Sequence, residues 1–557
     1  MTDLKIPVGI SDFAKIRNYD YYYVDKTGLI EDLLENETAE VTLITRPRRF
    51  GKTMGMSMLA NFFDIRKDSK AMFAGLEISK NAALCKEWMN QWPVVFLSFK
   101  NIDGDKFSLA YQQMVYEIGL LYDSYSELLT SNKLSEDDKA LFLQLKRRTA
   151  NEIDVLRSIQ FLLSLLYKHY GKTVILLLDE YDVPLAKSSA HGYYPDMLNV
   201  IKSMMTTSLK DNNTLRFAVI TGCLRIAKES IFTGTNNFVS DTISSSHLNE
   251  YFGFTQADVD QILKDADCME HADDIKNWYD GYHFGNLDVY CPWDVMNYLR
   301  DLQRNPKAKP ASYWKNTSDN SIIRSFIDYA GHSISRKLEI LLSGGYILQR
   351  IEENLTYDYL HSSEENLWSI LYLTGYLTQA REEDLPEPLP EGSSALMIPN
   401  AEVREIFETT IQKWFDESAQ TWNRKALFDA VWSGDTETLT KEMNKLLRKT
   451  ISYHDYREDF YHAFLAGIFA GAGYEVDSNK EHGEGRSDVV VLDPEEDRVA
   501  IFEAKYSRTQ DAMPRDCAAA LQQIENRQYA KEFEEDYDSI LCYGIAFYKK
   551  RCLVQTK

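Results

Sequence analysis

The segment that most constrains the fold is residues 174–178, a run of five residues that are all aliphatic. A strand without a polar position offers no face to solvent, so other elements must cover both of its faces. Further β-branched or apolar runs occupy residues 40–45, 93–99 and 215–221, and helical patterning separates them. Strands that alternate with helices predict a parallel sheet with helices on both faces, which is the α/β class.

A glycine–lysine–threonine triplet, Gly51-Lys52-Thr53, lies between the first of these strands and a helical pattern. Strand, loop and helix in this order are the context of a phosphate-binding P-loop. Glycine lets the backbone curl around phosphate oxygens, and the start of the helix presents free N–H groups to an anion. In such a loop the lysine faces the β- and γ-phosphates and the threonine hydroxyl is a Mg²⁺ ligand. We therefore expect ATP and Mg²⁺ here, with Arg49 and Phe50 completing the loop.

One position of the phosphate-binding motif is different. The motif G-x-x-x-x-G-K-[ST] begins with a glycine, and Arg46 occupies that position here. By its own rule the motif is incomplete, and a chance Gly-Lys-Thr in a basic loop is the alternative interpretation. The choice between the two therefore needs a second feature elsewhere in the chain.

An acidic pair, Asp179-Glu180, directly follows the buried run at residues 174–178. The carboxyl ends of parallel strands form the edge at which α/β sheets bind ligands, so this pair is expected beside the phosphate loop. Asp179 is the predicted Mg²⁺ ligand, and Glu180 is predicted to polarise the attacking water, which makes hydrolysis the expected reaction. An ordinary loop after a core strand is the alternative. Two such motifs on separate strands, in this order, favour the nucleotide site.

The strand at residues 215–221 ends in a third candidate group. Thr221 is predicted to sense the γ-phosphate, and Arg225 is predicted to reach it from four residues later. An arginine of this kind contacts the nucleotide of its own chain or, as an arginine finger, that of a neighbouring subunit. The second case implies a homo-oligomer. A surface arginine in a turn is the equally open alternative.

Asp488, Glu503 and Lys505 form a second constellation near the C-terminus. Alternate residues of a strand share a face, so Glu503 and Lys505 point the same way, and a hairpin would bring Asp488 beside them. Two carboxylates bind a divalent cation, Mg²⁺ or Mn²⁺, which polarises a phosphodiester and activates water. Glu458 begins an amphipathic helix, from which its carboxylate is expected to reach the same metal. An exposed Glu–Lys pair on a surface strand is the alternative for the triplet alone.

Several stretches resemble the AAA-ATPase-like proteins of bacteria, namely residues 23–27, 46–53, 178–182 and 221–225, together with residues 278–285, Trp314 and residues 398–400. That family typically has arginine at the position of Arg46, so the departure from the glycine motif agrees with it. The resemblance covers essentially the whole chain. It implies a P-loop NTPase core of the additional-strand, catalytic-glutamate type, followed by a helical or winged-helix lid.

The C-terminal part resembles the PD-(D/E)XK nuclease domain that is often fused to these ATPases. The resemblance lies in residues 459–462, 478–488, 502–505 and 520–524, with Tyr529. It implies a restriction-endonuclease-like α/β domain in which the constellation described above is the core triad and Glu458 is the helix carboxylate. It also implies that Gln523 and Tyr529 complete the far helix of the site.

These features divide the chain into three expected domains. They are an AAA-like P-loop ATPase domain at residues 1–245, a helical or winged-helix-like middle region at residues 246–430, and a PD-(D/E)XK nuclease-like domain at residues 431–557. The acidic, proline-containing residues 382–394 are interpreted as a long hairpin loop rather than as an interdomain linker.

The predicted function is ATP binding and hydrolysis coupled to a metal-dependent nuclease that cleaves nucleic acid. DNA is the favoured substrate, although the residues themselves do not separate DNA from RNA. The alternative is a nucleotide-switched signalling or scaffolding ATPase. In that case the C-terminal domain binds nucleic acid or a partner without cleavage.

The overall charge bears on the nucleic-acid prediction. The formal net charge is −23, whereas affinity for nucleic acid comes largely from lysine and arginine. Binding therefore requires a local basic patch, for which the candidates are Lys480, Arg486, Arg508, Arg515 and residues 549–551. Simple solubility is the alternative reading of the acidity.

Membrane attachment and disulfide bonds are not expected. No apolar run approaches the roughly 20 residues of a membrane span, and the N-terminal residues lack the pattern of a signal peptide. The seven cysteines are scattered and none lies in a C-x-x-C pair, so neither a disulfide framework nor a zinc site is predicted. A reducing cytoplasm is the expected location.

Overall fold

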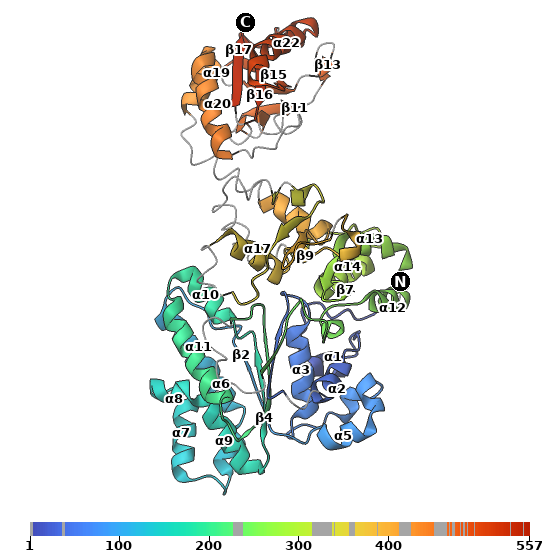
Figure 1. Cartoon of the computed structure of the whole chain (residues 1–557), viewed down its shortest axis with the longest axis vertical. Coiled ribbons are helices and arrows are strands. Elements are labelled where there is room, and N and C mark those ends of the chain that lie inside the picture. Colours follow the sequence, from blue (N-terminus) through green and yellow to red (C-terminus); the bar gives the residue numbers. More distant parts are fainter. Residues whose placement is uncertain are drawn as a thin grey trace. The chain divides into compact units, whose positions relative to one another are not determined.

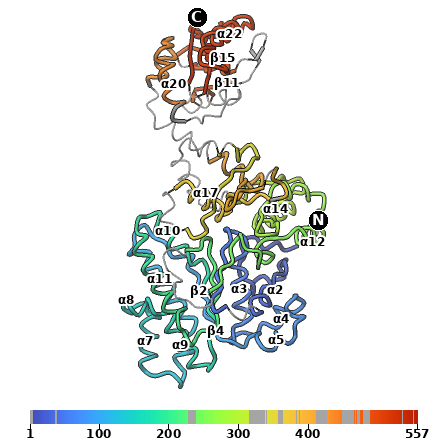
Figure 2. Tube along the Cα trace, viewed as in Figure 1, coloured from blue at the N-terminus to red at the C-terminus, as the bar shows by residue number. Residues whose placement is uncertain are grey.

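The computed structural model describes residues 4–35, 39–226, 238–314, 337–338, 340–355, 363–386, 388–410, 425–450, 465–466, 468–469, 474–478, 481–482, 485–486, 488–494, 496–534, 536–549 and 551–557. The chain forms two compact units. The first comprises Met1–Asp319 and Gly344–Ile406, and the second comprises Asn320–Ser343 and Phe407–Lys557. The elements of both units are labelled in Figure 1, and Figure 2 follows the same chain as a Cα trace.

The first unit is built on a five-stranded sheet in the order β2-β3-β4-β1-β5. All neighbouring strands are parallel, which confirms the predicted α/β class. One further strand, β4, lies between β1, which leads into the phosphate loop, and β3, which ends in the acidic pair. This is the additional-strand arrangement that the resemblance implied. The strands are β1 (Val41–Thr45), β2 (Val94–Ser98), β3 (Val174–Asp179), β4 (Leu215–Gly222) and β5 (Phe238–Asp241).

Helices cover both faces of this sheet. Figure 1 shows α1, α2, α3 and α5 on one side and α6, α9 and α11 on the other. The helices are α1 (Phe13–Asn18), α2 (Gly28–Glu35), α3 (Lys52–Phe63), α4 (Lys70–Phe73), α5 (Ala82–Trp88), α6 (Phe107–Asp123), α7 (Glu136–Lys146), α8 (Glu152–Leu156), α9 (Ser158–Tyr170), α10 (Val183–His191) and α11 (Tyr194–Leu209).

Strand β3 has the burial that its sequence predicts, because all six of its residues are buried. Ile175 and Leu177 belong to the same core cluster as Met56 and Leu59 of α3, the helix that follows the phosphate loop. Burial of one aliphatic side chain stabilises the fold by roughly 1.5–3 kcal/mol. Packing against β3 therefore fixes the position of α3, the helix that directly follows the phosphate loop.

The first unit continues beyond the sheet with helices and short antiparallel strands. β9 and β10 pair antiparallel, and residues 382–393 lie between them, which confirms the predicted hairpin. Among the described residues, no helix combines the length and the apolar character needed to cross a membrane. The elements are α12 (Gln256–Asp265), α13 (Ala272–Tyr279), β6 (Tyr282–Phe284), β7 (Leu287–Val289), α14 (Pro292–Arg304), β8 (Ile347–Gln349), α17 (Glu364–Leu373), β9 (Thr378–Gln379) and β10 (Ser394–Met397).

The second unit contains a mixed five-stranded sheet in the order β11-β14-β15-β16-β17. β15 and β16 are parallel, and the other neighbours are antiparallel. Helices accompany the sheet, which confirms the predicted C-terminal α/β domain. The elements are α19 (Lys425–Ser433), α20 (Thr436–Thr450), β11 (Glu475–Ser478), β12 (Glu481–His482), β13 (Gly485–Arg486), β14 (Val489–Asp493), β15 (Arg498–Tyr506), α22 (Met513–Asn526), β16 (Ser539–Tyr548) and β17 (Arg551–Thr556).

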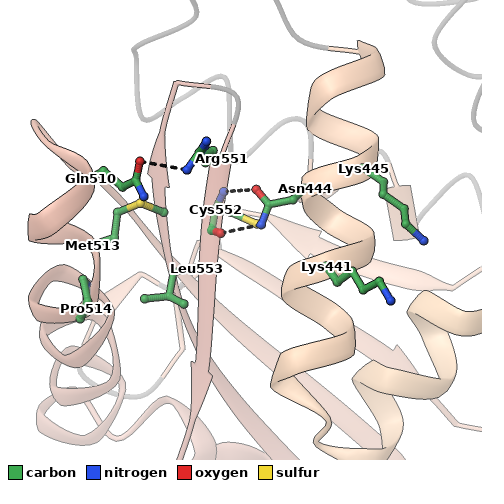
Figure 3. Close-up of a pocket in the computed structure, with 9 residues that line it drawn as sticks. All are labelled: Lys441, Asn444, Lys445, Gln510, Met513, Pro514, Arg551, Cys552 and Leu553. Atoms are coloured by element: carbon green, nitrogen blue, oxygen red, sulfur yellow. Dashed lines mark hydrogen bonds between the residues drawn. The ribbon is translucent and has the colours of Figure 1, made fainter.

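Helix α20 protects the edge strand β17. Asn444 donates its Nδ2 to the carbonyl oxygen of Cys552 and accepts the N–H of Cys552 at its Oδ1, each at 2.9 Å (Figure 3). Thr440, one turn earlier, accepts the N–H of Val554 at 3.0 Å. An edge strand with free N–H and C=O groups invites pairing with other chains. Side chains of α20 satisfy three of these groups.

We predict that Asn444→Ala destabilises the second unit by about 1–3 kcal/mol, since each of the two hydrogen bonds that this side chain makes to β17 contributes about 0.5–1.5 kcal/mol. Hydrogen exchange of the full chain, followed by mass spectrometry on peptides that cover β17, measures the loss. Lys441→Ala is the matched control, because Lys441 lies on the same helix with an exposed side chain. Unchanged exchange of β17 in Asn444→Ala would contradict the prediction.

Candidate nucleotide and metal sites

The phosphate loop runs from the end of β1 at Thr45 to the start of α3 at Lys52. Two of its residues have a left-handed backbone, Arg49 with φ 74° and Gly51 with φ 87°. A Cβ at Gly51 would meet no atom within 4 Å, so conformation rather than space favours glycine there. The loop therefore has the tight curl that a phosphate group requires.

The side chain of Lys52 points back into this loop. It is 6% exposed, and its Nζ donates to the carbonyl oxygens of Arg46 and Pro47, both at 2.7 Å. Thr53, the next residue of α3, is half-buried. The ammonium group is thus held by backbone acceptors of the loop, which leads into the start of a helix, where free N–H groups can meet an anion.

Asp179 and Thr221 meet at the carboxyl ends of β3 and β4. Asp179 is fully buried, and its Oδ1 accepts a hydrogen bond of 2.5 Å from Thr221 Oγ1. Its Oδ2 has no hydrogen-bond partner in the part of the chain that the structure describes. A buried carboxylate oxygen without a donor is costly, and carboxylate oxygen is the ligand that Mg²⁺ prefers. These residues therefore fit the predicted metal.

Glu180 has an unusual backbone and unusual electrostatic surroundings. Its φ of 54° lies in the left-handed region, which is uncommon for a residue other than glycine. Burial raises the pKa of Glu180, the negative charge of Asp179 raises it further, and Lys52 lowers it. A carboxyl group with a raised pKa is a stronger base once it is ionised, so these surroundings suit the role predicted for Glu180.

A cavity of about 530 Å³ gathers most of the predicted nucleotide residues. It is lined by the predicted residues Arg49, Phe50, Gly51, Lys52, Thr53 and Glu180, and in addition by Arg48, Lys100, Asp182, Lys187 and Cys223. The cavity therefore has several cationic side chains around the phosphate loop. Lys100 and Lys187 were not predicted, because each is a single lysine without a motif around it.

A second set of residues lines the same cavity and is mainly apolar or aromatic. It includes Val8, Gly9, Ile10, Tyr251, Phe254, Trp293 and Met296. The Arg49 guanidinium lies 4.2 Å from the centre of the Trp293 ring, which links this set to the phosphate loop. The sequence prediction missed all of these residues. They come from three distant segments, and no local pattern marks any of them.

Three predicted nucleotide residues do not line this cavity. Asp179 and Thr221 are buried at the sheet edge. Arg225 is half-buried beyond the end of β4, and residues 227–237, which follow it, lie outside the described residues. The roles of these three residues remain predictions.

The C-terminal constellation is brought together by the pairing of β14 and β15. Val489 lies opposite Phe502, so Asp488 is placed beside Glu503 across the pair. Asp488 Oδ2 accepts the N–H of Ala504 at 2.7 Å, and Glu503 Oε1 accepts a hydrogen bond from Lys505 Nζ at 2.8 Å. The two carboxylates are 8% and 1% exposed, whereas the lysine side chain is 28% exposed.

The other residues predicted for this site have different outcomes. Glu458 lies outside the described residues, so its position is not established. Gln523 of α22 donates its Nε2 to the hydroxyl of Tyr529 at 3.4 Å. Within the described ranges, no group of three or more histidine, cysteine or carboxylate residues gathers that could hold a metal. Asp488 and Glu503 offer two carboxylates, a set that fits Mg²⁺ with water as its remaining ligands.

A buried pair of carboxyl groups lies near the phosphate loop in the first unit. Asp294, in the first turn of α14, and Glu402 are each 1% exposed. Burial raises the pKa of both groups, and the negative charge of Asp294 raises the pKa of Glu402 further. Arg49 of the loop lowers the pKa of Asp294. Two buried carboxyl groups that share a site do not both ionise readily, so the pair retains a proton.

Comparisons with known proteins agree with this geometry. Residues 7–232 match the AAA-ATPase-like family described as Predicted AAA-ATPase, and residues 456–557 match the PD-(D/E)XK nuclease superfamily. The chain thus carries an AAA-ATPase-like domain and a domain of the PD-(D/E)XK nuclease superfamily, which confirms both resemblances. The chain is also similar to an uncharacterized protein in the vnfD 5′ region of Azotobacter chroococcum mcd 1. The two are 25% identical over 98% of this chain and 97% of that protein.

We predict that Glu402→Gln flattens the dependence of stability on pH. The folded chain keeps a proton on Glu402 that the unfolded chain releases near the ordinary pKa of 4.5. The folded state therefore binds more protons, and wild-type stability falls as the pH rises above roughly 5. Glutamine has the shape of the protonated acid and does not titrate. Thermal unfolding midpoints between pH 6 and pH 9 measure the difference.

The matched control for this prediction is Glu408→Gln, which changes an exposed glutamate of the same helical stretch. It should keep the pH dependence of the wild type. An equally steep fall of the unfolding midpoint in Glu402→Gln and in the wild type would contradict the prediction.

Proposed function

We propose that this chain binds and hydrolyses ATP with Mg²⁺ in its AAA-ATPase-like domain. We also propose that it cleaves DNA phosphodiesters with Mg²⁺ or Mn²⁺ in its nuclease-superfamily domain. The first activity is supported chiefly by the buried Asp179–Thr221 hydrogen bond at the carboxyl ends of β3 and β4. The second is supported by the contact of Lys505 with Glu503 beside Asp488.

At the nucleotide site, each expected role has a candidate residue. Lys52 offers its ammonium group to the β- and γ-phosphates, in exchange for the two carbonyl oxygens that hold it now. Glu180 accepts the proton of the attacking water. Thr53 and Asp179 would hold Mg²⁺, which neutralises phosphate charge when it is bound.

The shape and lining of the cavity support a nucleotide rather than a free phosphate ion. A volume of about 530 Å³ lies within the range of roughly 300–1,000 Å³ that is common for small-molecule sites. The aromatic and apolar set around Trp293 provides surface on which a purine base can stack. The cationic set lies around the phosphate loop. A ligand with one apolar and one anionic end fits this division.

At the C-terminal site, Asp488 and Glu503 would hold the divalent cation, which polarises the phosphodiester when it is bound. Lys505 carries a positive charge next to Glu503 and stabilises the charge that develops on the phosphate. Arg508 and Arg551 are exposed. Arg508 follows the end of β15 at Tyr506, and Arg551 begins β17 opposite Tyr548, the last residue of β16. They supply part of the basic patch that an acidic chain needs for DNA.

We further propose that ATP turnover in the first domain regulates cleavage in the second. The relative from Azotobacter chroococcum mcd 1 aligns along 97% of its own length, so both halves occur together in that chain as well. A reducing cytoplasm is the proposed location, because the seven cysteines have no disulfide partner in this structure.

We predict that Lys52→Ala abolishes ATP hydrolysis and that Glu180→Gln retains ATP binding but lowers kcat by about 10²-fold or more. The lysine is needed to hold the phosphates, whereas the glutamate acts only on the water. Phosphate release and fluorescence binding of N-methylanthraniloyl-ATP separate the two effects. Lys86→Ala changes an exposed lysine of α5 and is the matched control. Hydrolysis by Lys52→Ala at the wild-type rate would refute the assignment.

We predict that Asp488→Asn and Lys505→Met both remove cation-dependent DNA cleavage, but in different ways. Asp488→Asn loses Mn²⁺ affinity, whereas Lys505→Met keeps it, because only the first residue is a proposed ligand. Nicking of supercoiled DNA and calorimetric titration with Mn²⁺ measure these outcomes. The control is Asp511→Asn at an exposed position. The nuclease proposal fails if the wild type cuts neither DNA nor RNA with Mg²⁺ or Mn²⁺, with or without ATP.

A further inference from the structure

We propose that Arg46 is a positioning residue for Lys52, and that its buried guanidinium takes the place of the first glycine of the phosphate-binding motif. The inference rests on the proposed ATP site and assigns a role to the residue at which this motif departs from its rule. A glycine there would serve through backbone freedom. An arginine that is 0% exposed must act through its contacts.

The guanidinium of Arg46 is fixed by several acceptors at once. Its Nη1 donates to the carbonyl oxygens of Thr45 at 2.8 Å and Asp241 at 3.1 Å. Its Nη2 donates to the Asp241 carboxylate and to Asn249 Oδ1, the second at 2.8 Å. The planar guanidinium of arginine spreads five N–H donors over three nitrogens, so it reaches acceptors that lie farther apart than those that the three donors of a single lysine nitrogen can reach.

The surroundings of this group make its position rigid. The guanidinium carbon lies 5.4 Å from the ring centre of Phe252 and 5.8 Å from that of Phe284. Burial lowers the pKa of Arg46, and the negative charge of Asp241 opposes this effect. A buried ion pair is strongly destabilised when one partner is removed. The side chain therefore has one stable place, between aromatic rings and at the end of β5.

The backbone of Arg46 connects its fixed side chain to the ammonium group of Lys52. The N–H of Arg46 donates to the carbonyl oxygen of Gly222 on β4 at 3.2 Å. Its carbonyl oxygen is one of the two acceptors that hold Lys52 Nζ, and Pro47 supplies the other. The first residue of the loop is thus tied to β4 through its N–H and to β5 through its side chain. The two lysine acceptors therefore have a defined place.

Restoring the glycine motif tests the proposal. Arg46→Gly completes the sequence pattern G-x-x-x-x-G-K-T, and Asp241→Asn is added so that no buried charge is left without its partner. We compare the double variant with the wild type in the full chain. The probes are N-methylanthraniloyl derivatives of ATP, ADP and AMP, with Mg²⁺, and fluorescence reports binding.

The expected result is a loss of affinity that depends on phosphate number. Lys52 is expected to face the β- and γ-phosphates. The double variant should therefore bind the ATP and ADP probes about tenfold or more weakly, with the AMP probe nearly unchanged. A purely structural role for Arg46 would weaken all three probes equally, and that outcome would overturn the proposal. Unchanged binding of the ATP probe by the completed glycine motif would overturn it as well.

Two further variants keep the test decisive. Arg147→Gly with Asp137→Asn makes the same changes of residue type at two exposed positions, one in α7 and one directly after it, and this variant should bind all probes like the wild type. Circular dichroism shows whether the first double variant folds. If it does not, Arg46→Lys is judged by the same three probes. Absence of binding by the wild type would instead reject the proposed ATP site, which separates that failure from the failure of the role of Arg46.

Discussion

The proposed nucleotide site depends on one constraint, the parallel order of β3, β4 and β1. Parallel neighbours bring their carboxyl ends to one edge of the sheet. β4 lies in the middle, so Thr221 can reach Asp179 on one side while it is in register with Ile44 of β1 on the other. Because β3 is buried along its whole length, Asp179 lies in a poorly solvated place. Charge interactions are stronger there, so strand order sets both the geometry and the strength of the site.

The phosphate loop is also shaped by residues that follow the sheet in the chain. The Phe50 ring packs edge-on against Tyr282 with 4.9 Å between ring centres. A Cβ at Gly375 would lie 2.8 Å from the Cβ of Pro47, so the backbone near α17 lies directly against the loop. Packed interiors transmit displacement instead of absorbing it. Rearrangement of the backbone around Gly375 would therefore change the loop that is proposed to bind the phosphates.

The sequence predicted those parts of the fold and sites that local patterns specify. The aliphatic run of β3, the strand–loop–helix order around Lys52 and the alternation of Glu503 and Lys505 are all visible within a few residues. The sequence did not predict the residues around Trp293, which come from three separate segments. It also missed the Asp294–Glu402 pair and the burial of Arg46. From sequence alone, charged residues are usually predicted to be exposed. Only long-range packing determines which of them are buried and desolvated.

The two candidate sites would both bind phosphate in an acidic chain, but they use buried side chains of opposite charge. Phosphate is anionic, and the chain carries a net charge of −23. At the loop the chain supplies a buried cation, Lys52, whose desolvation is offset by two carbonyl oxygens, so affinity for an anion is intrinsic. At the C-terminal site it supplies two buried carboxylates and one lysine. A phosphodiester is repelled there until a divalent cation is bound. For the proposed nuclease activity, metal binding therefore precedes productive nucleic-acid binding at this site, whereas in the proposed ATPase the phosphate loop engages a nucleotide before any metal arrives.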